Sequence, residues 1–195
     1  MEKFTQLTST AVPLPIEDID TDQIIPSRYL KVISKEGFGD HLFRDWRYDN
    51  SGNPISDFVF NNAMYTGKIL IAGRNFGCGS SREHAAWALE DYGFRVVISS
   101  FFADIFKGNA MNNGIVPITV SEDYLHQLFT SIEQDAKSVF TIDLEKQELS
   151  NGEGNIFLFE IDAYKKDCLI NGFDDIDYLL SMRKEIELFE RKMAS

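Results

Sequence analysis

Basic residues are scarce in this chain of 195 residues, where 19 lysines and arginines stand against 31 aspartates and glutamates and the net charge is −12. A chain of this charge is poorly suited to neutralise phosphates, which argues against nucleic acids and anionic membranes as partners. Long apolar runs are absent as well, and none approaches the roughly 20 residues of a membrane span. The first six residues, MEKFTQ, lack the apolar core of a signal peptide. We therefore expect a soluble cytoplasmic protein.

Cysteine and histidine are also rare, with two and three residues. Cys78 and Cys168 form no C-x-x-C pair, and two free cytoplasmic thiols are the expected state. The competing interpretation is a nucleophile pair of Cys78 and His84, but no feature of the sequence orients these two side chains toward each other. The spacing of His41, His84 and His126 is not that of metal ligands. The sequence therefore predicts no metal site on this chain.

The most informative stretch is residues 73–84, GRNFGCGSSREH, which lies between an apolar run at 69–72 and a helix-forming run at 85–89. This order predicts a strand, a glycine-rich loop and the start of a helix. Such a junction directs backbone N–H groups and the positive end of the helix dipole at one point, where an anion can bind. Arg82 supplies the planar fork that binds a carboxylate through two hydrogen bonds.

Two common types of glycine loop do not match this stretch. A P-loop requires Lys directly before its Ser or Thr, whereas Gly79 precedes Ser80. A dinucleotide-binding loop that begins at Gly77 would need a third glycine at the position of Arg82. The ligand is therefore not expected to be a nucleotide.

Ser80 has two interpretations that the spacing leaves open. Ser80 and Glu83 fit the S-x-x-E capping box, in which the serine caps the following helix. Alternatively, the local N–H donors stabilise the Ser80 alkoxide, and the serine acts as a base.

The pattern along the chain predicts a single α/β domain, 1–195, with a partly parallel sheet, a late hairpin and a C-terminal helix. Pro117 indicates that its strand lies at an edge of the sheet or contains a bulge. The tail helix, 174–193, is expected to bury apolar side chains at Ile176, Leu179, Leu180, Ile186 and Phe189. The remaining expected elements are an extended lead at 1–16, a loop-rich region at 17–62, strands at 68–73, 96–99 and 115–120, helices at 81–92, 103–112 and 121–135 (the last capped by Ser121), and hairpin strands at 140–144 and 156–161 around a turn at 151–154.

Several motifs resemble the mobile swivel domain of the aconitase superfamily. Residues 77–85, GCGSSREHA, are similar to its G-x-G-S-S-R-E-H-A signature, and residues 18–30 are similar to its D-T-D-x-I-I-P-x-R/Q-x-L segment. Residues 100–109 are close to S-F-A-D-I-F-x-x-N, and residues 37–47 resemble an insertion found in bacterial small subunits. The resemblance runs from about residue 3 to about residue 172. It implies a three-layer β/β/α fold with a specificity and insertion region at about 27–62.

The resemblance also implies that this chain is one part of an enzyme. An aconitase-type cluster needs three protein thiolates, and the chain has two cysteines. The [4Fe-4S] cluster is therefore expected on a separate large subunit, in a heterodimer or larger assembly. The implied reaction is a hydro-lyase reaction of leucine biosynthesis, in which 2-isopropylmalate loses water and regains it as 3-isopropylmalate.

Site roles follow from the matched motif positions, with Ser80 as the catalytic base. The substrate-binding residues are expected to be Ser81, Arg82, Arg28, Leu30 and Val32. The supporting residues are expected to be Asp22, His84, Gly77 and Gly79. Taken without the resemblance, three of these features have ordinary interpretations: Asp22 belongs to a solvated acidic turn, Arg28 is a surface charge, and the segment around Leu30 is a solvent-facing loop.

Two alternative functions remain open. The substrate could be homoaconitate, citraconate or another 2-alkylmalate, and Lys31 keeps a third substrate carboxylate possible. The chain could also be a non-catalytic carboxylate-binding module that retains the fold, although Ser80, Arg82 and Arg28 argue against this.

Overall fold

Strand β1 (Gln6–Leu14) lies at the centre of the sheet and connects its two halves. The computed structural model describes residues 1–31, 35–152 and 154–193, and in this part of the chain the strand order is β4-β3-β2-β1-β5-β6-β7. β1 pairs in parallel with β2 and antiparallel with β5. The other strands are β2 (Ile69–Ala72), β3 (Val96–Ser99), β4 (Val116–Thr119), β5 (Val139–Asp143), β6 (Glu148–Asn151) and β7 (Ile156–Leu158).

The parallel half alternates strands and helices. Helix α3 (Glu83–Tyr92) connects β2 to β3, and α4 (Asp104–Asn112) connects β3 to β4. Every residue of β2 and β3 is buried, as expected for parallel strands covered on both faces. β4 is an edge strand and carries Pro117, so of the two predicted positions, edge or bulge, the edge is confirmed.

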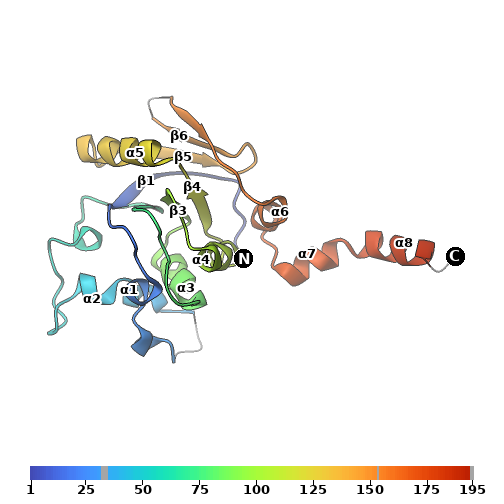
Figure 1. The fold of residues 1–195 in the computed structure, drawn as a ribbon, viewed down its shortest axis with the longest axis horizontal. Helices are drawn as coiled ribbons and strands as arrows, with labels where there is room; N and C mark the ends of the chain where they lie inside the picture. The colour runs from blue at the N-terminus through green and yellow to red at the C-terminus, as the bar shows by residue number, and fades with distance from the viewer. Residues whose placement is uncertain (32–34, 153, 194–195) are drawn as a thin grey trace.

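The sheet curls so that its antiparallel half covers one face of its parallel half (Figure 1). Phe140 and Ile142 of β5 share a buried cluster with Ile69 and Ile71 of β2. A second cluster on the opposite face packs the parallel strands against α3 and α4. Two layers of sheet and one layer of helices result, which confirms the expected β/β/α architecture.

Helix α5 (Glu122–Gln134) confirms the predicted amphipathic helix. The Ser121 hydroxyl accepts a hydrogen bond from the Tyr124 N–H at 3.2 Å and caps the helix. Leu125, Leu128 and Ile132 are buried against the second core cluster.

Both predicted hairpin strands form, as β5 and β7, but they do not pair with each other, because a strand that was not predicted, β6, lies between them. β6 pairs with both β5 and β7, and after β6 the Gly154 N–H donates to the Asn151 carbonyl at 3.1 Å, near the predicted turn. β6 reads ELSN and buries only Leu149, so it lacks the apolar alternation by which a strand is recognised. Helix α6 (Ala163–Asn171), which buries Cys168 and Leu169, was also not predicted.

In the described part of 17–62, the helices are short segments joined by loops, which agrees with the predicted loop-rich region. Its aromatic side chains form a packed group in which Phe43 stacks on Trp46 and meets Phe60 edge to face. Val32 of the expected specificity segment lies outside the described residues. The segments are α1 (Thr21–Ile24), η1 (Ser27–Tyr29), η2 (Phe38–His41), α2 (Arg44–Arg47) and η3 (Val59–Asn61).

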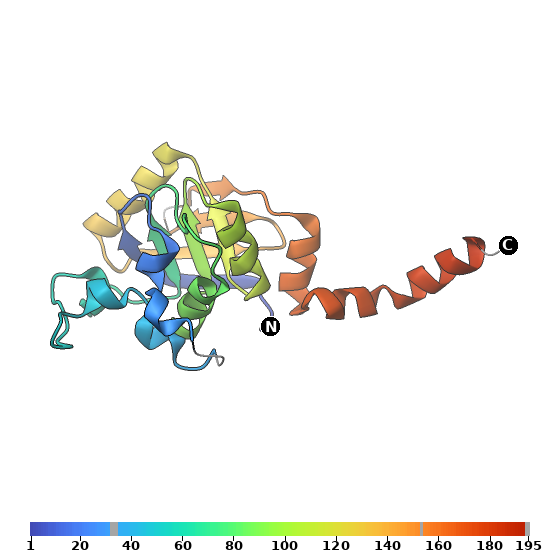
Figure 2. The same ribbon diagram turned by 60° about the horizontal axis from the view of Figure 1, so that its bottom comes forward.

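The tail differs from the prediction in two respects. It contains two helices, α7 (Asp175–Ser181) and α8 (Arg183–Met193), separated at Met182. Both project away from the domain (Figures 1 and 2), and the apolar residues that were expected to make contacts are exposed. An apolar stripe shows that a helix has a face to bury, but it does not show that the same chain buries it. No helix in the described part of the chain is long and apolar enough to cross a membrane.

Candidate active site

The glycine loop between β2 and α3 has a left-handed backbone at three positions. Asn75, Gly77 and Gly79 have φ values of 63°, 77° and 87°. A Cβ atom at Gly77 would lie 2.2 Å from Cγ of Phe106, a buried side chain of α4. Gly77 is therefore required by both backbone conformation and space.

The loop is held by the segment that contains α1. The Gly77 N–H donates to the Ile19 carbonyl at 2.8 Å, and the Thr21 N–H donates to the Cys78 carbonyl at 2.9 Å. The Thr21 hydroxyl donates to the Ser80 carbonyl at 2.8 Å. Sequence reasoning did not single out Thr21, although it is the central residue of the D-T-D motif. Its buried side chain fixes the backbone of the candidate base.

Ser80 does not cap the helix, so the capping-box interpretation is wrong. Helix α3 begins at Glu83, and its N-cap residue is Arg82, which forms no side-chain capping bond. Ser80 and Ser81 are both exposed. Since α3 begins two residues later than predicted, the Ser80 side chain lies too far upstream to bond the first turn, and its hydroxyl remains available for chemistry.

Arg82 forms an ion pair with Asp22 through its Nη1 atom. The Arg82 side chain is 15% exposed, while that of Asp22 is 52% exposed. Within the described residues, the Nε and Nη2 atoms of Arg82 have no hydrogen-bond partner. Asp22 therefore holds one arm of the guanidinium and leaves its other edge open to a carboxylate.

Ser80 and Arg82 line a shared depression of about 240 Å³. One side is formed by the loop, including Ser80 and Arg82, and the other by residues 103–106 at the start of α4. Ala103, the N-cap residue of α4, makes no side-chain capping bond, and Ile105 is an exposed apolar residue. Residues 103–106 belong to a motif that indicated the superfamily, but the sequence did not identify them as part of the site.

Arg28 lies in a different depression, together with Arg44, Tyr48 and Asp49. Its guanidinium forms two hydrogen bonds with Asp45, one of which joins Nη1 to Oδ2 at 3.0 Å. Hydrogen bonding to Arg28 lowers the pKa of Asp45 below its usual value. The structure thus brings Ser80, Arg82 and Asp22 together but does not place Arg28 with them.

Two other expected site residues have packing contacts. Leu30 is half-buried and packs against the core. His84 is the second residue of α3, and its ring lies 4.5 Å from that of Trp87 and 5.6 Å from that of Phe38. These contacts agree with a supporting position for His84 behind the loop.

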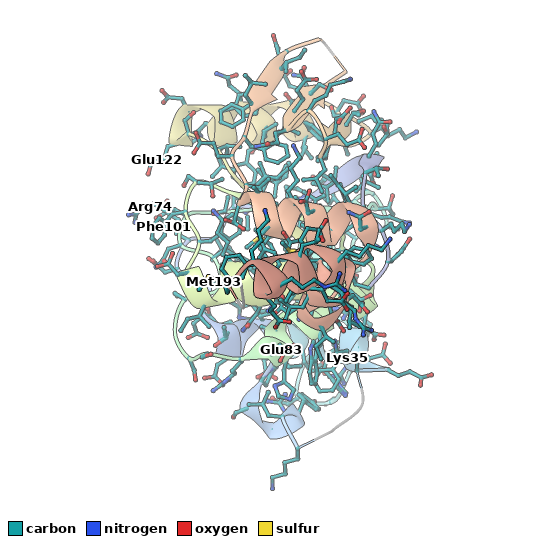
Figure 3. All side chains as sticks on the ribbon, turned by 90° about the vertical axis from the view of Figure 1, so that its right-hand side faces the viewer. Lys35, Arg74, Glu83, Phe101, Glu122 and Met193 are labelled. Atoms are coloured by element: carbon teal, nitrogen blue, oxygen red, sulfur yellow. The ribbon has the colours of Figure 1, made fainter. Side chains whose placement is uncertain are left out.

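Glu83, labelled in Figure 3 with Lys35, connects the start of α3 to the insertion region. Asn113 donates to the Glu83 carboxylate at 3.2 Å and accepts from the Lys35 ammonium at 2.7 Å. The glutamate of the S-x-x-E pattern therefore serves in a side-chain network instead of a capping box.

The thiols are poorly suited to nucleophilic chemistry. Partial burial, together with the nearby Asp20 and Asp18, raises the pKa of Cys78, so its thiol stays protonated near neutrality. Burial likewise raises the pKa of Cys168. Within the described residues, no group of three or more His, Cys, Asp or Glu side chains is arranged to hold a metal ion.

Comparisons with known proteins agree with this geometry. Residues 1–123 match the family model of the aconitase C-terminal domain. The 3-isopropylmalate dehydratase small subunit of Azobacteroides pseudotrichonymphae is 63% identical over 98% of both chains. The small subunit of the same name from Cytophaga hutchinsonii is 59% identical over 98% of this chain and 96% of that protein.

A solved structure shows the same fold. The crystal structure of a 3-isopropylmalate dehydratase from Methanocaldococcus jannaschii aligns with a TM-score of 0.65 and 29% identity, covering 96% of this chain and 99% of that one. The family-model match, the sequence identity along almost the whole chain and the shared fold lead to one conclusion. This chain belongs to the family of 3-isopropylmalate dehydratase small subunits, which is built on the aconitase C-terminal domain.

Proposed function

We propose that this chain, together with a large subunit, forms a cytoplasmic dehydratase that isomerises 2-isopropylmalate to 3-isopropylmalate in leucine biosynthesis. Identity to small subunits along almost the whole chain supports this reaction. The structural observation that carries the proposal is the open edge of the Arg82 guanidinium, which shares a depression with the exposed Ser80 hydroxyl. A carboxylate bound to Arg82 would bring the rest of a small substrate to Ser80.

Ser80 is the proposed base. In the dehydration it would take the proton from the carbon next to the hydroxyl-bearing carbon, and in the rehydration it would return a proton. A serine acts in this way only where hydrogen-bond donors stabilise its alkoxide. The glycine loop and the nearby start of α3 are suitable sources of such donors.

Arg82 is the proposed carboxylate clamp, and Asp22 keeps it oriented. Ser81 is adjacent and would assist in binding. Arg28 remains a proposed second clamp, but it would have to exchange Asp45 for the substrate, since the two form a paired fork in the free chain. Leu30 and Val32 remain the proposed contacts of the isopropyl group.

The [4Fe-4S] cluster of this reaction does not fit this chain. Cys78 and Cys168 are its only cysteines, whereas three thiolates are needed. The cluster, and with it the polarisation of the leaving hydroxyl, is therefore assigned to the large subunit. Isolated, this chain should carry no iron and have no dehydratase activity.

The test is to co-express the chain with the large subunit, reconstitute the complex anaerobically and assay it with 2-isopropylmalate, homoaconitate and citraconate. The expected result is turnover of 2-isopropylmalate by the complex, with iron found only in the large subunit. Preference for homoaconitate or citraconate would reassign the substrate. A cluster-loaded complex without turnover would favour a non-catalytic carboxylate-binding module.

A further inference from the structure

The side-chain amide of Asn113 connects two oppositely charged residues from different parts of the chain. Its oxygen accepts a hydrogen bond from the Lys35 ammonium at 2.7 Å, and its NH₂ group donates to the Glu83 carboxylate at 3.2 Å. The same NH₂ group also donates to the Asn109 carbonyl at 2.8 Å. Asn113 is 8% exposed. Both N–H bonds and the oxygen of this buried amide therefore have partners, which fixes its orientation.

Trp87 closes these contacts into a cycle of four side chains, which we call the Asn113 cycle: Lys35, Asn113, Glu83 and Trp87. The Lys35 ammonium lies over the Trp87 ring, 5.1 Å from its centre, and the Trp87 Nε1–H donates to the Glu83 carboxylate at 3.3 Å. Figure 3 shows Lys35 and Glu83 on the same side of the molecule. Because each member contacts two others, the cycle restrains its members more than one exposed ion pair would.

The cycle joins three segments that border the proposed substrate site. Glu83 begins α3 and directly follows Arg82, the proposed carboxylate clamp. Asn113 follows the last residue of α4, and the first residues of that helix line the depression at the site. Lys35 lies three positions after Val32, a proposed contact of the isopropyl group. The cycle therefore connects the carboxylate-binding side of the site to the segment that is proposed to bind the alkyl group.

The Lys35 side chain is not needed to attach the insertion region to the domain. Phe38 of η2 is buried, and its ring meets that of Trp87 edge to face at 5.7 Å. The Gly39 N–H donates to the Asp91 carboxylate at 2.8 Å. Both contacts hold η2 on α3 without the ammonium. Lys35 is exposed, so its hydrogen bond adds a local restraint to a region that is already folded.

We propose that Asn113 is a positioning residue which, through Lys35 and Glu83, controls the selection of substrates by the size of their alkyl group. This inference rests on the proposed function, in which Arg82 binds a carboxylate and Val32 contacts the isopropyl group. One substrate makes both contacts only if the two segments are held at a matching separation. The Asn113 cycle provides that restraint.

The two ends of the substrate depend on this restraint to different degrees. A larger alkyl group gains more from an apolar contact than a smaller one does. 2-Isopropylmalate carries an isopropyl group, whereas citraconate carries only a methyl group. Breaking the cycle should therefore lower kcat/KM for 2-isopropylmalate more than kcat/KM for citraconate. A loss of folded protein would lower both values equally, so the ratio of the two separates positioning from stability.

The first test changes Lys35 in the complex reconstituted with the large subunit. Lys35→Met keeps an apolar stem and removes the ammonium. It should raise KM for 2-isopropylmalate and reduce the ratio of kcat/KM for 2-isopropylmalate to that for citraconate roughly fivefold. Lys35→Arg retains a donor for Asn113 and a cation over Trp87, so it should keep the KM and the ratio of the wild type.

Lys165→Met is the matched control. The Lys165 ammonium donates to the Asn112 side chain at 2.8 Å and lies over the Tyr164 ring, 4.6 Å from its centre. These are the same kinds of contact, made by α6 instead of the insertion region. The control should therefore keep the wild-type ratio. Thermal unfolding checks that each variant is folded at the assay temperature.

The second test determines whether Lys35 and Glu83 act through one amide. Glu83→Ala should lower the ratio, whereas Glu83→Gln should largely keep it, because the glutamine oxygen still accepts from Asn113 and Trp87. The double variant Lys35→Met/Glu83→Ala should lower the ratio no further than the stronger single variant, since each change already opens the cycle. Asn113→Leu removes the amide at similar volume and should match the double variant.

The proposal is overturned if Lys35→Met leaves both KM for 2-isopropylmalate and the ratio unchanged in a folded, cluster-loaded complex. It is also overturned if the effects of Lys35→Met and Glu83→Ala multiply in the double variant, because independent effects would not pass through Asn113. A cluster-loaded wild-type complex that turns over neither substrate would refute the proposed function and this inference with it. Wild-type turnover with unchanged variants would refute this inference alone.

Discussion

Arg82 and Asp22 form an ion pair that joins two segments 60 residues apart, the glycine loop and the first turn of α1. The pair occupies one arm of the guanidinium and leaves its other edge open. It couples the D-T-D motif to the S-S-R-E motif, and several consequences of this arrangement can be measured.

The Asp22→Asn variant keeps the shape of the side chain and removes its charge. Arg82 would lose its orienting partner, so KM should rise more than kcat falls. The ratio kcat/KM should decrease about 5- to 30-fold, equivalent to roughly 1–2 kcal/mol. Steady-state kinetics of the reconstituted complex provide the measurement, with Asp123→Asn on α5 as a remote control. An unchanged KM would show that Asp22 does not position Arg82.

The Ser80→Ala variant should lower kcat strongly with little effect on KM, since the proposed base acts on the reacting carbon. Because Ser80 does not cap α3, its loss should change the free energy of unfolding by less than about 0.5 kcal/mol. Activity assays and thermal unfolding together separate the two roles. Normal activity in a folded, cluster-loaded complex would remove Ser80 from the mechanism.

The Arg82→Lys variant should fail in a different way, because a point charge replaces a planar fork. Binding and turnover should weaken together by about 2–4 kcal/mol in transition-state stabilisation. Steady-state kinetics of both variants in the same assay provide the measurement, in which the separate changes in KM and kcat distinguish a clamp from a base. Equal behaviour of the two variants would argue against separate roles.

The Gly77→Ala variant should destabilise the domain by about 2–4 kcal/mol. The alanine would have to adopt the left-handed backbone of Gly77, and its Cβ atom would collide with Phe106. Gly37→Ala is a matched control, because Gly37 has a similar φ of 82° with no atom within 4 Å of the added Cβ. Denaturant unfolding measures both variants. Equal losses of stability would show that backbone strain, and not the contact with Phe106, is the cause.

Cys78 should react slowly with iodoacetamide at neutral pH. Its raised pKa lowers the fraction of the reactive thiolate at each pH, so the rate should still be rising where a free cysteine has reached its plateau. The Cys78→Ser variant gives the background from Cys168, which is buried. A plateau below about pH 8 would reveal a low-pKa thiolate and favour the nucleophile alternative.

Leu30 and Val32 should affect the enzyme differently. Leu30→Ala should reduce stability, because Leu30 packs on the core, and should also lower kcat/KM for 2-isopropylmalate, because it removes a proposed contact of the isopropyl group. Val32→Arg should lower kcat/KM for 2-isopropylmalate and raise it for substrates with a third carboxylate, since an apolar pocket gains about 0.8 kcal/mol per CH₂ and disfavours an unpaired charge. The ratio of the kcat/KM values for the two substrate types, measured in each variant, shows whether these residues set substrate specificity. If Val32→Arg leaves that ratio unchanged, specificity is set elsewhere.

The local features of this protein were readable from the sequence because local chemistry determines them. Glycines marked the left-handed loop, Ser121 marked the start of α5, and Pro117 marked an edge strand. Buried apolar runs separated by helices predicted the parallel half of the sheet. The motifs at 18–30 and 77–85 identified the superfamily.

Other features depended on which segments meet in space. The start of α3 at Glu83 excluded Ser80 as a cap, although the spacing fitted one. Strand β6 forms because β5 and β7 supply its hydrogen-bond partners, while its own residues are largely polar. Arg28 and Arg82 look equivalent in the sequence, but Asp45 pairs with both arms of the first and Asp22 with one arm of the second. A sequence pattern specifies conformation and which face is apolar, whereas the availability of a side chain depends on its neighbours after folding, and only the tertiary structure determines these.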